Sequence, residues 1–210
     1  MKNIAFDFDF TLADTSASIL SSLEFAFHTS GFRPKLSISD DFFKVKGLKL
    51  REQIVAIAGE SVPDSDLNFM IEQFMNFYRK EGMKKTVPYP GIYELFDFFS
   101  GKDIATHIVS AKSKVNLVAT IEFFELKPTK LIGGVALGEK VDYLISEGCS
   151  TYVGDMDIDV EISRRAGCNS VILHAPKDQT YKWNNQADFY FDTLQEFVSW
   201  VEDEKNLAKL

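Results

Sequence analysis

The stretch IAFDFDFTLADT, residues 4–15, raises a physical question about buried charge. A short apolar run leads directly into three acidic side chains, Asp7, Asp9 and Asp14. Burying even one unpaired carboxylate costs on the order of several kcal/mol. The rest of the sequence must therefore provide, or bind, a charge that compensates these carboxylates.

The composition limits the classes of protein that fit. The chain has 210 residues, of which 45% are apolar, and this is enough to bury a substantial core. A net charge of −8 and the absence of a basic run disfavour nucleic acids and anionic membranes as partners, and favour small molecules or proteins. The two cysteines, Cys149 and Cys168, form no CxxC motif, which predicts reduced packing residues. Because no long apolar stretch or cleavage site follows Met1, we expect a cytoplasmic protein. The sequence leaves the oligomeric state open.

Short apolar or β-branched runs that end in polar or glycine residues predict six buried strands. They lie at residues 3–6, 104–110, 130–134, 151–154, 170–174 and 188–191. Helical periodicity separates the later runs, at residues 115–123, 141–145, 160–166 and 197–207. Strands that alternate with helices predict an α/β fold with a doubly wound parallel sheet and right-handed crossovers.

A long insertion interrupts this pattern. About a hundred residues separate Phe6 from Ile104, whereas a simple crossover needs a few tens. The periodicity in this gap is helical, and the turn-prone VPYPG at 87–91 closes it. We therefore expect a core of residues 1–13 and 88–210, with a mostly helical domain at 14–87 inserted in it.

Some side chains of the insertion have simple expected roles. Asp14 and Thr15 are expected to cap its first helix. Phe69, Phe74 and Phe77 are expected to fill its apolar interior.

Polar side chains follow several of the predicted core strands, where open α/β sheets bind their ligands. They are Asp7, Asp9 and Thr11 after the first strand, Ser110 at the end of the second, Lys140 after the third, and Asp155, Asp157 and Asp159 after the fourth. Carboxylates that converge at one sheet edge repel one another unless a cation neutralises them, and hard oxygen ligands suit Mg²⁺. A magnesium ion is therefore the expected source of compensating charge.

Such a site suits phosphoryl transfer. A metal-bound carboxylate can attack a phosphoryl group in line, while the cation and a lysine offset its charge. Asp9 can give a proton to the leaving oxygen and then take one from water. An aspartyl-phosphate intermediate divides one slow hydrolysis into two steps.

Four segments carry a resemblance to a known family. FDFDFTLADT (6–15), IVSAKS (108–113), EKVDYLI (139–145) and YVGDMDID (152–159) resemble, in this order, the four motifs of the haloacid dehalogenase-like hydrolase superfamily. YPGIYELFDFF (89–99) is similar to its phosphoglycolate-phosphatase-like branch. The resemblance covers nearly the whole core and implies the Rossmann-like fold of that family. The long insertion resembles the family's helical cap, which closes over small substrates.

The resemblance implies a role for each carboxylate of the site. Asp7 would be the nucleophile and a Mg²⁺ ligand. Asp9 would be the general acid and base, with its main-chain carbonyl on the metal. Asp155 would bind Mg²⁺, and Asp159 would support the metal site from behind.

The resemblance also implies three groups that hold the phosphoryl oxygens. Thr11 and Ser110 would bind them, and Lys140 would neutralise them and orient the nucleophile. Lys127, in the Lys-Pro form that many relatives have, is the rival lysine. We prefer Lys140 because Lys127 precedes the third strand, at its wrong end.

Two positions depart from the family pattern. Phe10 replaces the usual Gly, which places a bulky ring near the phosphate loop. Ala111 replaces a common Asn, although the expected role at that position belongs mainly to the backbone amide.

One basic cluster, KVKGLKLRE at 44–52, lies in the acidic insertion. It is typical of a solvated helix start. A cap over a phosphorylated substrate also needs groups that contact it, and Lys46, Lys49 or Arg51 could bind the distal end of the substrate.

The favoured function is a Mg²⁺-dependent phosphatase that acts on a small phosphorylated metabolite. The first alternative is a phosphomutase of the β-phosphoglucomutase type, in which a sugar rather than water accepts the phosphoryl group. The second is a non-catalytic module that binds a phosphorylated ligand or a protein, and Phe10 is the one feature in its favour. A true haloacid dehalogenase is disfavoured because Asp9 would have no role in its chemistry.

Overall fold

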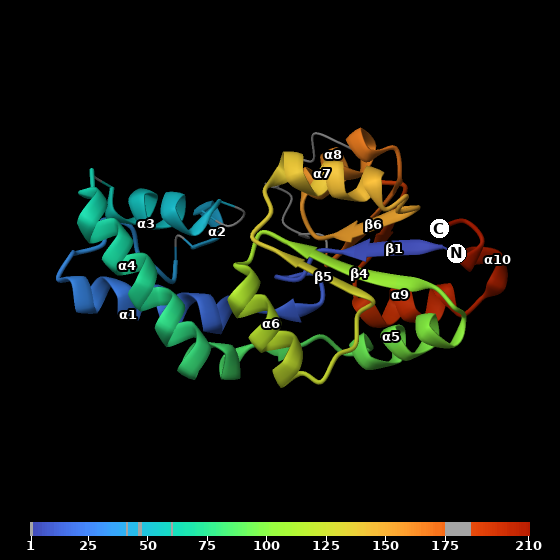
Figure 1. Cartoon of the computed structure of the whole chain (residues 1–210), viewed down its shortest axis with the longest axis horizontal. Coiled ribbons are helices and arrows are strands. Elements are labelled where there is room, and N and C mark those ends of the chain that lie inside the picture. Colours follow the sequence, from blue (N-terminus) through green and yellow to red (C-terminus); the bar gives the residue numbers. More distant parts are fainter. Residues whose placement is uncertain (1, 41, 46–47, 60, 175–185) are drawn as a thin grey trace. The chain divides into compact units, whose positions relative to one another are not determined.

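The computed structural model describes residues 2–40, 42–45, 48–59, 61–174 and 186–210 (Figure 1). The chain divides into two compact units. Unit 1 comprises Met1–Asp14 and Val87–Leu210, and unit 2 comprises Thr15–Thr86.

Unit 1 alternates strands with helices. Its elements are β1 (Asn3–Phe6), β2 (Ala13–Asp14), β3 (Val87–Pro88), α5 (Ile92–Gly101), β4 (Ala105–Ser110), α6 (Lys114–Phe123), β5 (Lys130–Gly133), α7 (Leu137–Ser146), β6 (Thr151–Gly154), α8 (Asp157–Ala166), β7 (Asn169–Leu173), β8 (Phe189–Phe191), α9 (Leu194–Val201) and α10 (Glu204–Leu207).

Six of these strands form one sheet in the order β5-β4-β1-β6-β7-β8, and every neighbouring pair is parallel. In the register of the sheet, Phe6 at the end of β1 lies opposite Ile108 of β4 and Val153 of β6. The carboxyl ends of these three strands therefore meet at one edge. The predicted α/β fold with a parallel sheet is confirmed.

Helices cover both faces of the sheet, with α7 and α8 on one face and α5 and α9 on the other (Figure 1). Side chains alternate between these faces along β1. Ile4 and Phe6 join the cluster that includes Phe99 of α5, whereas Ala5 joins the cluster that includes Leu144 of α7. Because both faces are covered, β1 is apolar at every position after Asn3.

A second, two-stranded sheet was not predicted. β2 pairs with β3 in antiparallel register, with Ala13 opposite Pro88 and Asp14 opposite Val87. Each strand has two residues, which is too short for a periodic sequence signal.

Unit 2 is built from helices. They are α1 (Ser16–Ser30), α2 (Phe42–Val45), α3 (Leu50–Ala58), α4 (Asp64–Phe77), the π-helical turn η1 (Tyr78–Gly82) and the 3₁₀ turn η2 (Met83–Lys85). The ring of Phe25 on α1 stacks on Phe77 of α4, with centroids 4.5 Å apart. The helical path of α4 continues directly into η1, whose turn is π-helical and reaches Gly82.

Two expectations for unit 2 were wrong in detail. Phe69 is 43% exposed, so only Phe74 and Phe77 contribute to the interior. Thr15 occupies the N-cap position of α1, but its buried hydroxyl makes no capping hydrogen bond, and Asp14 lies in β2.

Two expectations for unit 1 also differ from the structure. The apolar positions predicted for the helix at 115–123 include Val115 and Phe123, which are exposed. The face of α6 that packs inward carries Leu117 and Ile121 together with the polar Thr120, whose hydroxyl donates to a backbone carbonyl of the same helix. The pattern at 197–207 is two helices, because α9 ends at Val201 and α10 begins after a new N-cap.

Within the described residues, no helix is both long and apolar enough to span a membrane.

Candidate active site

Asp7 is the first residue after β1, and its carboxylate is held at both oxygens. The Phe8 amide donates to Oδ1 at 2.7 Å, and the Lys140 ammonium donates to Oδ2 at 2.9 Å. The Asp7 amide donates to the carbonyl of Val153, which fixes the chain against β6. The side chain keeps 17% of its surface exposed, so a substrate can reach it.

Lys140 lies in the first turn of α7 and is 4% exposed. Burial alone would lower its pKa, but the carboxylates of Asp7, Asp159 and Asp155 outweigh burial and raise it. Lys140 is therefore a permanent cation beside Asp7. The rival Lys127 is exposed in the segment that precedes β5.

Tyr152 supports Lys140 from below and was missed by the sequence analysis. Its hydroxyl accepts a hydrogen bond from the Lys140 ammonium at 2.8 Å and donates to the Val109 carbonyl at 3.4 Å. The ring is fully buried in β6, and burial raises the pKa of the phenol well above its usual range. The signal was present, because Tyr152 is the one residue of the buried TYVG strand with a polar tip on a large side chain.

Asp9 is held by a second buried lysine that sequence reasoning also missed. The Lys112 ammonium donates to Oδ1 of Asp9 at 2.9 Å, and the two side chains are 7% and 22% exposed. Lys112 lies two residues beyond the end of β4, in the IVSAKS segment. A lysine in a loop at the same sheet edge as two aspartates was the available signal.

Thr11 and Ser110 lie at the same edge and are almost fully buried. The Thr11 hydroxyl lies 3.3 Å from Oδ1 of Asp155 and donates to it. The Ser110 hydroxyl accepts a hydrogen bond from the Lys112 amide at 3.3 Å. The Thr11 hydroxyl therefore lies beside a carboxylate, and the Ser110 hydroxyl contacts the backbone of the loop that follows β4.

Asp159 stabilises the loop between β6 and α8. Its Oδ2 accepts hydrogen bonds from the amides of Asp155 at 3.1 Å and Met156 at 3.0 Å. Burial, together with the nearby carboxylate of Asp7, raises the Asp159 pKa to about 6, although Lys140 opposes the shift. Gly154 makes this packing fit, because a Cβ there would lie 2.2 Å from Cγ of Asp159.

Phe10 has a backbone conformation that ordinarily favours glycine. Its φ is +64°, in the left-handed region that disfavours bulky side chains. The Phe10 amide donates to the Ala13 carbonyl at 2.8 Å, and the amides of Thr11 and Leu12 donate to the Phe8 carbonyl. This tight turn contains Asp9 and Thr11 and joins Asp7 to β2.

The charge balance of the site answers the question that the sequence raised. Four carboxylates, those of Asp7, Asp9, Asp155 and Asp159, face two ammonium groups, so this set carries two uncompensated negative charges when ionised. Oδ1 of Asp159 is buried without a hydrogen bond from the described residues. A divalent cation suits both observations.

In the described part of the chain, no three His, Cys, Asp or Glu side chains are already arranged as a metal cage. Mg²⁺ usually binds one or two protein carboxylates and keeps several waters. The donors present here fit that ion.

The basic residues proposed for the insertion are not gathered into a free cluster. Arg51 donates to Oδ1 of Asp64 at 3.0 Å and to Oδ1 of Asn68 at 2.8 Å. Lys49 is the N-cap residue of α3 and is exposed. Lys46 lies outside the described residues.

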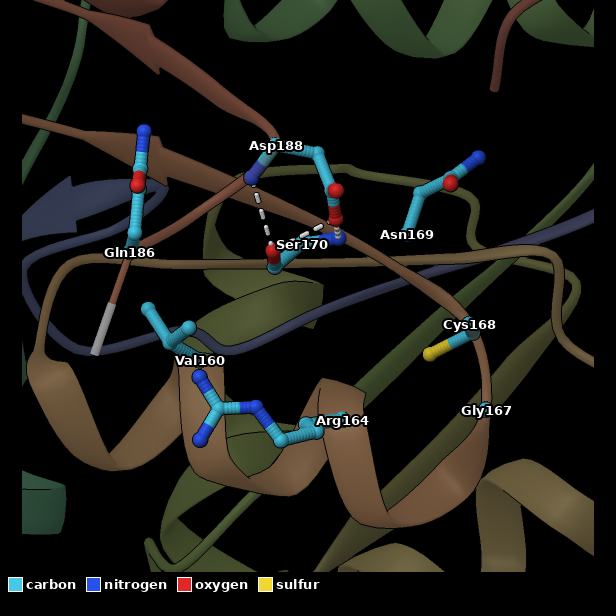
Figure 2. A pocket seen from close by; sticks show the side chains of 8 residues that line it. All are labelled: Val160, Arg164, Gly167, Cys168, Asn169, Ser170, Gln186 and Asp188. Carbon is cyan, nitrogen blue, oxygen red and sulfur yellow. Dashed lines mark hydrogen bonds between the residues drawn. The ribbon is translucent and has the colours of Figure 1, made fainter.

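A pocket of about 290 Å³ lies between α8 and the start of β7, and none of the candidate-site carboxylates lines it (Figure 2). Asn169 and Ser170, which line it, begin β7, whereas the candidate site lies at the carboxyl ends of the strands. Its polar groups satisfy one another, since Oδ2 of Asp188 accepts from both the amide and the hydroxyl of Ser170. The pocket therefore contributes no group to the candidate site.

Comparison with known proteins places this geometry in context. A family model described as haloacid dehalogenase-like hydrolase matches residues 4–173. A phosphoglycolate phosphatase from Agrobacterium fabrum is 30% identical over 137 residues, which are 64% of this chain and 57% of that protein. The match therefore spans less than two thirds of the relative's length.

Solved structures show the same fold. A haloacid dehalogenase-like family hydrolase from Streptococcus pneumoniae aligns with a TM-score of 0.77 at 16% identity, over 95% of this chain and 98% of that one. A predicted phosphoglycolate phosphatase from Haemophilus somnus aligns with a TM-score of 0.76 at 20% identity, over 95% and 97% of the two chains.

Proposed function

Because this chain belongs to the haloacid dehalogenase-like hydrolase family, we propose that it is a Mg²⁺-dependent phosphatase that acts through a phosphoryl group on Asp7. The observation that carries the proposal is the paired arrangement of Asp7 and Asp9. Each carboxylate is held at 2.9 Å by its own buried lysine, at the sheet edge that also carries Asp155. A simple turn or a binding module has no need of a nucleophile beside an acid and base.

In the first step, a carboxylate oxygen of Asp7 forms a bond to phosphorus as the bond from phosphorus to the ester oxygen breaks. The ester oxygen keeps the electron pair of that bond and receives a proton from the carboxyl group of Asp9, so an alcohol leaves. In the second step, the oxygen of a water molecule attacks phosphorus and gives a proton to Asp9. Inorganic phosphate leaves and the Asp7 carboxylate is restored.

The neighbouring groups hold the phosphoryl oxygens during both steps. The hydroxyls of Thr11 and Ser110 donate to them, and Lys140 offsets their charge while it orients Asp7. When bound by Asp7, Asp155 and the main-chain carbonyl of Asp9, with Asp159 behind them, Mg²⁺ supplies further positive charge.

The substrate that we propose is a small phosphorylated metabolite, and the Agrobacterium relative makes phosphoglycolate the first ester to test. Lys46, Lys49 and Arg51 remain proposed contacts for the distal end of the substrate. Arg51 would first have to exchange its bonds to Asp64 and Asn68. The proposed location is the cytoplasm, which cell fractionation would test.

The decisive experiment measures phosphate release from p-nitrophenyl phosphate, phosphoglycolate and sugar phosphates, with and without Mg²⁺, beside the Asp7→Asn variant. We expect metal-dependent release that the variant loses while it keeps its melting temperature. Turnover of the variant above about a tenth of wild type would remove Asp7 from the nucleophile role. Isomerised sugar phosphate without net release would favour the phosphomutase. Metal binding without either product would favour the non-catalytic module.

A further inference from the structure

Each proposed catalytic aspartate has a buried lysine partner of its own. Lys140 holds Asp7 and Lys112 holds Asp9, both at 2.9 Å, and the two ammonium-bearing side chains are 6% and 7% exposed. Lys140 has an expected role in the proposed mechanism, whereas none of the roles above uses Lys112. A buried lysine that contacts the acid and base needs an explanation.

The loop after β4 holds Lys112 firmly in place. Its amide donates to the Ser110 hydroxyl at 3.3 Å, and its carbonyl accepts from the Gly134 amide at 2.7 Å. Gly133 allows this loop to lie directly on the end of β5, because a Cβ there would lie 2.7 Å from Cα of Lys114. Lys112 is therefore fixed at its backbone as well as at its ammonium.

We propose that Lys112 is a positioning residue that aims the carboxyl group of Asp9 at the ester oxygen of the leaving group. The inference rests on the proposed phosphatase function and extends it to a residue with no assigned role. Asp9 has two rotatable side-chain bonds, and the hydrogen bond from Lys112 selects one orientation of its carboxylate. Without Lys112, the Asp9 carboxyl group can still transfer a proton, but its orientation toward the ester oxygen is no longer fixed.

Leaving groups distinguish this role from a merely structural one. The p-nitrophenolate anion is a weak base and can depart with little help from an acid. The alkoxide that would leave from β-glycerophosphate is a strong base and must receive a proton. The value of kcat/KM reports the steps up to departure of the alcohol, so it isolates the first proton transfer. Damage to the fold or to phosphoryl binding lowers kcat/KM for both esters alike.

The test compares Lys112→Met with the wild type on these two esters in saturating Mg²⁺. We expect kcat/KM on β-glycerophosphate to fall about tenfold more than on p-nitrophenyl phosphate, with Lys112→Arg restoring part of the loss. Lys114→Met makes the same charge change at an exposed position two residues on and should leave the ratio unchanged. On an Asp9→Asn background, Lys112→Met should have little further effect, because the two residues act as one unit.

Three results would overturn the proposal. An equal loss on both esters would make Lys112 structural, and a rise in KM alone would make it a substrate-binding residue. If Lys112→Met does not fold, Lys112→Ala removes the same donor with a smaller side chain, and an unchanged ratio between the esters in that variant has the same meaning. A wild-type protein that releases phosphate from neither ester overturns the proposed function itself, and this inference with it.

Discussion

The ammonium of Lys140 and the hydroxyl of the buried Tyr152 lie 2.8 Å apart, and the same ammonium donates to Asp7. A hydrogen bond to a buried charged group contributes roughly 1.5–3 kcal/mol, and its loss leaves that charge less well solvated. Tyr152→Phe removes this acceptor and keeps the ring. We expect the ammonium to shift toward Asp7 and kcat to fall by about tenfold or more, as measured by phosphate release.

Tyr143→Phe is the matched control for Tyr152→Phe. It also removes one phenolic hydroxyl, but that hydroxyl contacts His107 rather than the candidate site. Equal kcat values for the two variants would show that Tyr152 does not support Lys140 in catalysis.

The uncompensated negative charge of the site predicts that Mg²⁺ stabilises the fold. Four carboxylates face the ammonium groups of Lys112 and Lys140, and a cation that binds only the folded state raises the melting temperature by mass action. Asp155→Asn should abolish most of this shift at millimolar Mg²⁺, whereas Asp157→Asn, two residues on, should retain it. A wild-type melting temperature that does not respond to Mg²⁺ or to its removal by a chelator would argue against the metal site.

We expect a steric effect at Gly154, in the segment that leads into the proposed metal ligand Asp155. A methyl group there would meet Cγ of Asp159 at 2.2 Å, and Asp159 is fixed by two amide hydrogen bonds. Gly154→Ala should therefore lower the free energy of unfolding by roughly 1–3 kcal/mol and reduce activity. Gly138→Ala is the control, because a Cβ at Gly138 meets no atom within 4 Å. If urea titrations give the same free energy of unfolding for Gly154→Ala and Gly138→Ala, the loop accommodates the added methyl group without a loss of stability.

The positive φ of Phe10 predicts that two truncated variants, Phe10→Gly and Phe10→Ala, differ in stability in an unusual order. An L-residue in the left-handed region costs roughly 1–2 kcal/mol that Gly does not incur. Phe10→Gly and Phe10→Ala both lose the buried ring, so their difference isolates the backbone. Phe10→Gly should be more stable than Phe10→Ala by about 1 kcal/mol in chemical denaturation, although Ala is ordinarily the more stabilising residue. The usual order would show that the backbone of Phe10 is not strained in solution.

The sequence predicted the sheet well because parallel strands leave a strong signal, although the edge strands β5 and β8 contain no fully buried residue. Runs such as TYVG are apolar and end at a glycine or a charged residue, and the register then brings the ends of β1, β4 and β6 together. Asp7 and Lys140 could be expected to meet for the same reason. The catalytic roles of these residues remain predictions.

The supporting contacts could not be predicted in the same way. Lys112 and Tyr152 have no local pattern that reveals a partner, because each reaches a residue from another strand or helix. The buried face of α6 was misjudged because Thr120 satisfies its hydroxyl within its own helix and packs inward, while Phe123 is exposed. Periodicity detects the helix, but tertiary packing decides which face is buried.

His107 predicts a pH dependence of stability that arises away from the candidate site. Its ring is 1% exposed in β4, and Nδ1 lies 3.2 Å from the Tyr143 hydroxyl and 3.8 Å from Sγ of Cys149. Burial lowers the pKa of His107 below its usual 6.5, with Lys130 adding to the shift and Glu147 opposing it. Burial also raises the pKa of Tyr143 and of Cys149 to about 12, so both stay neutral near pH 6.

The sign of the effect follows from the lowered pKa. The unfolded chain binds a proton on His107 as the pH falls through 6.5, whereas the folded protein binds it only at lower pH. The stability from neutral His107 is therefore complete above pH 6.5 and is lost as the pH falls toward the folded pKa. His107→Gln should flatten this loss in urea unfolding curves measured between about pH 5 and 7.5, and His28→Gln, at an exposed position, should not. An identical pH dependence for all three proteins would mean that His107 takes up its proton as readily in the folded state as in the unfolded one.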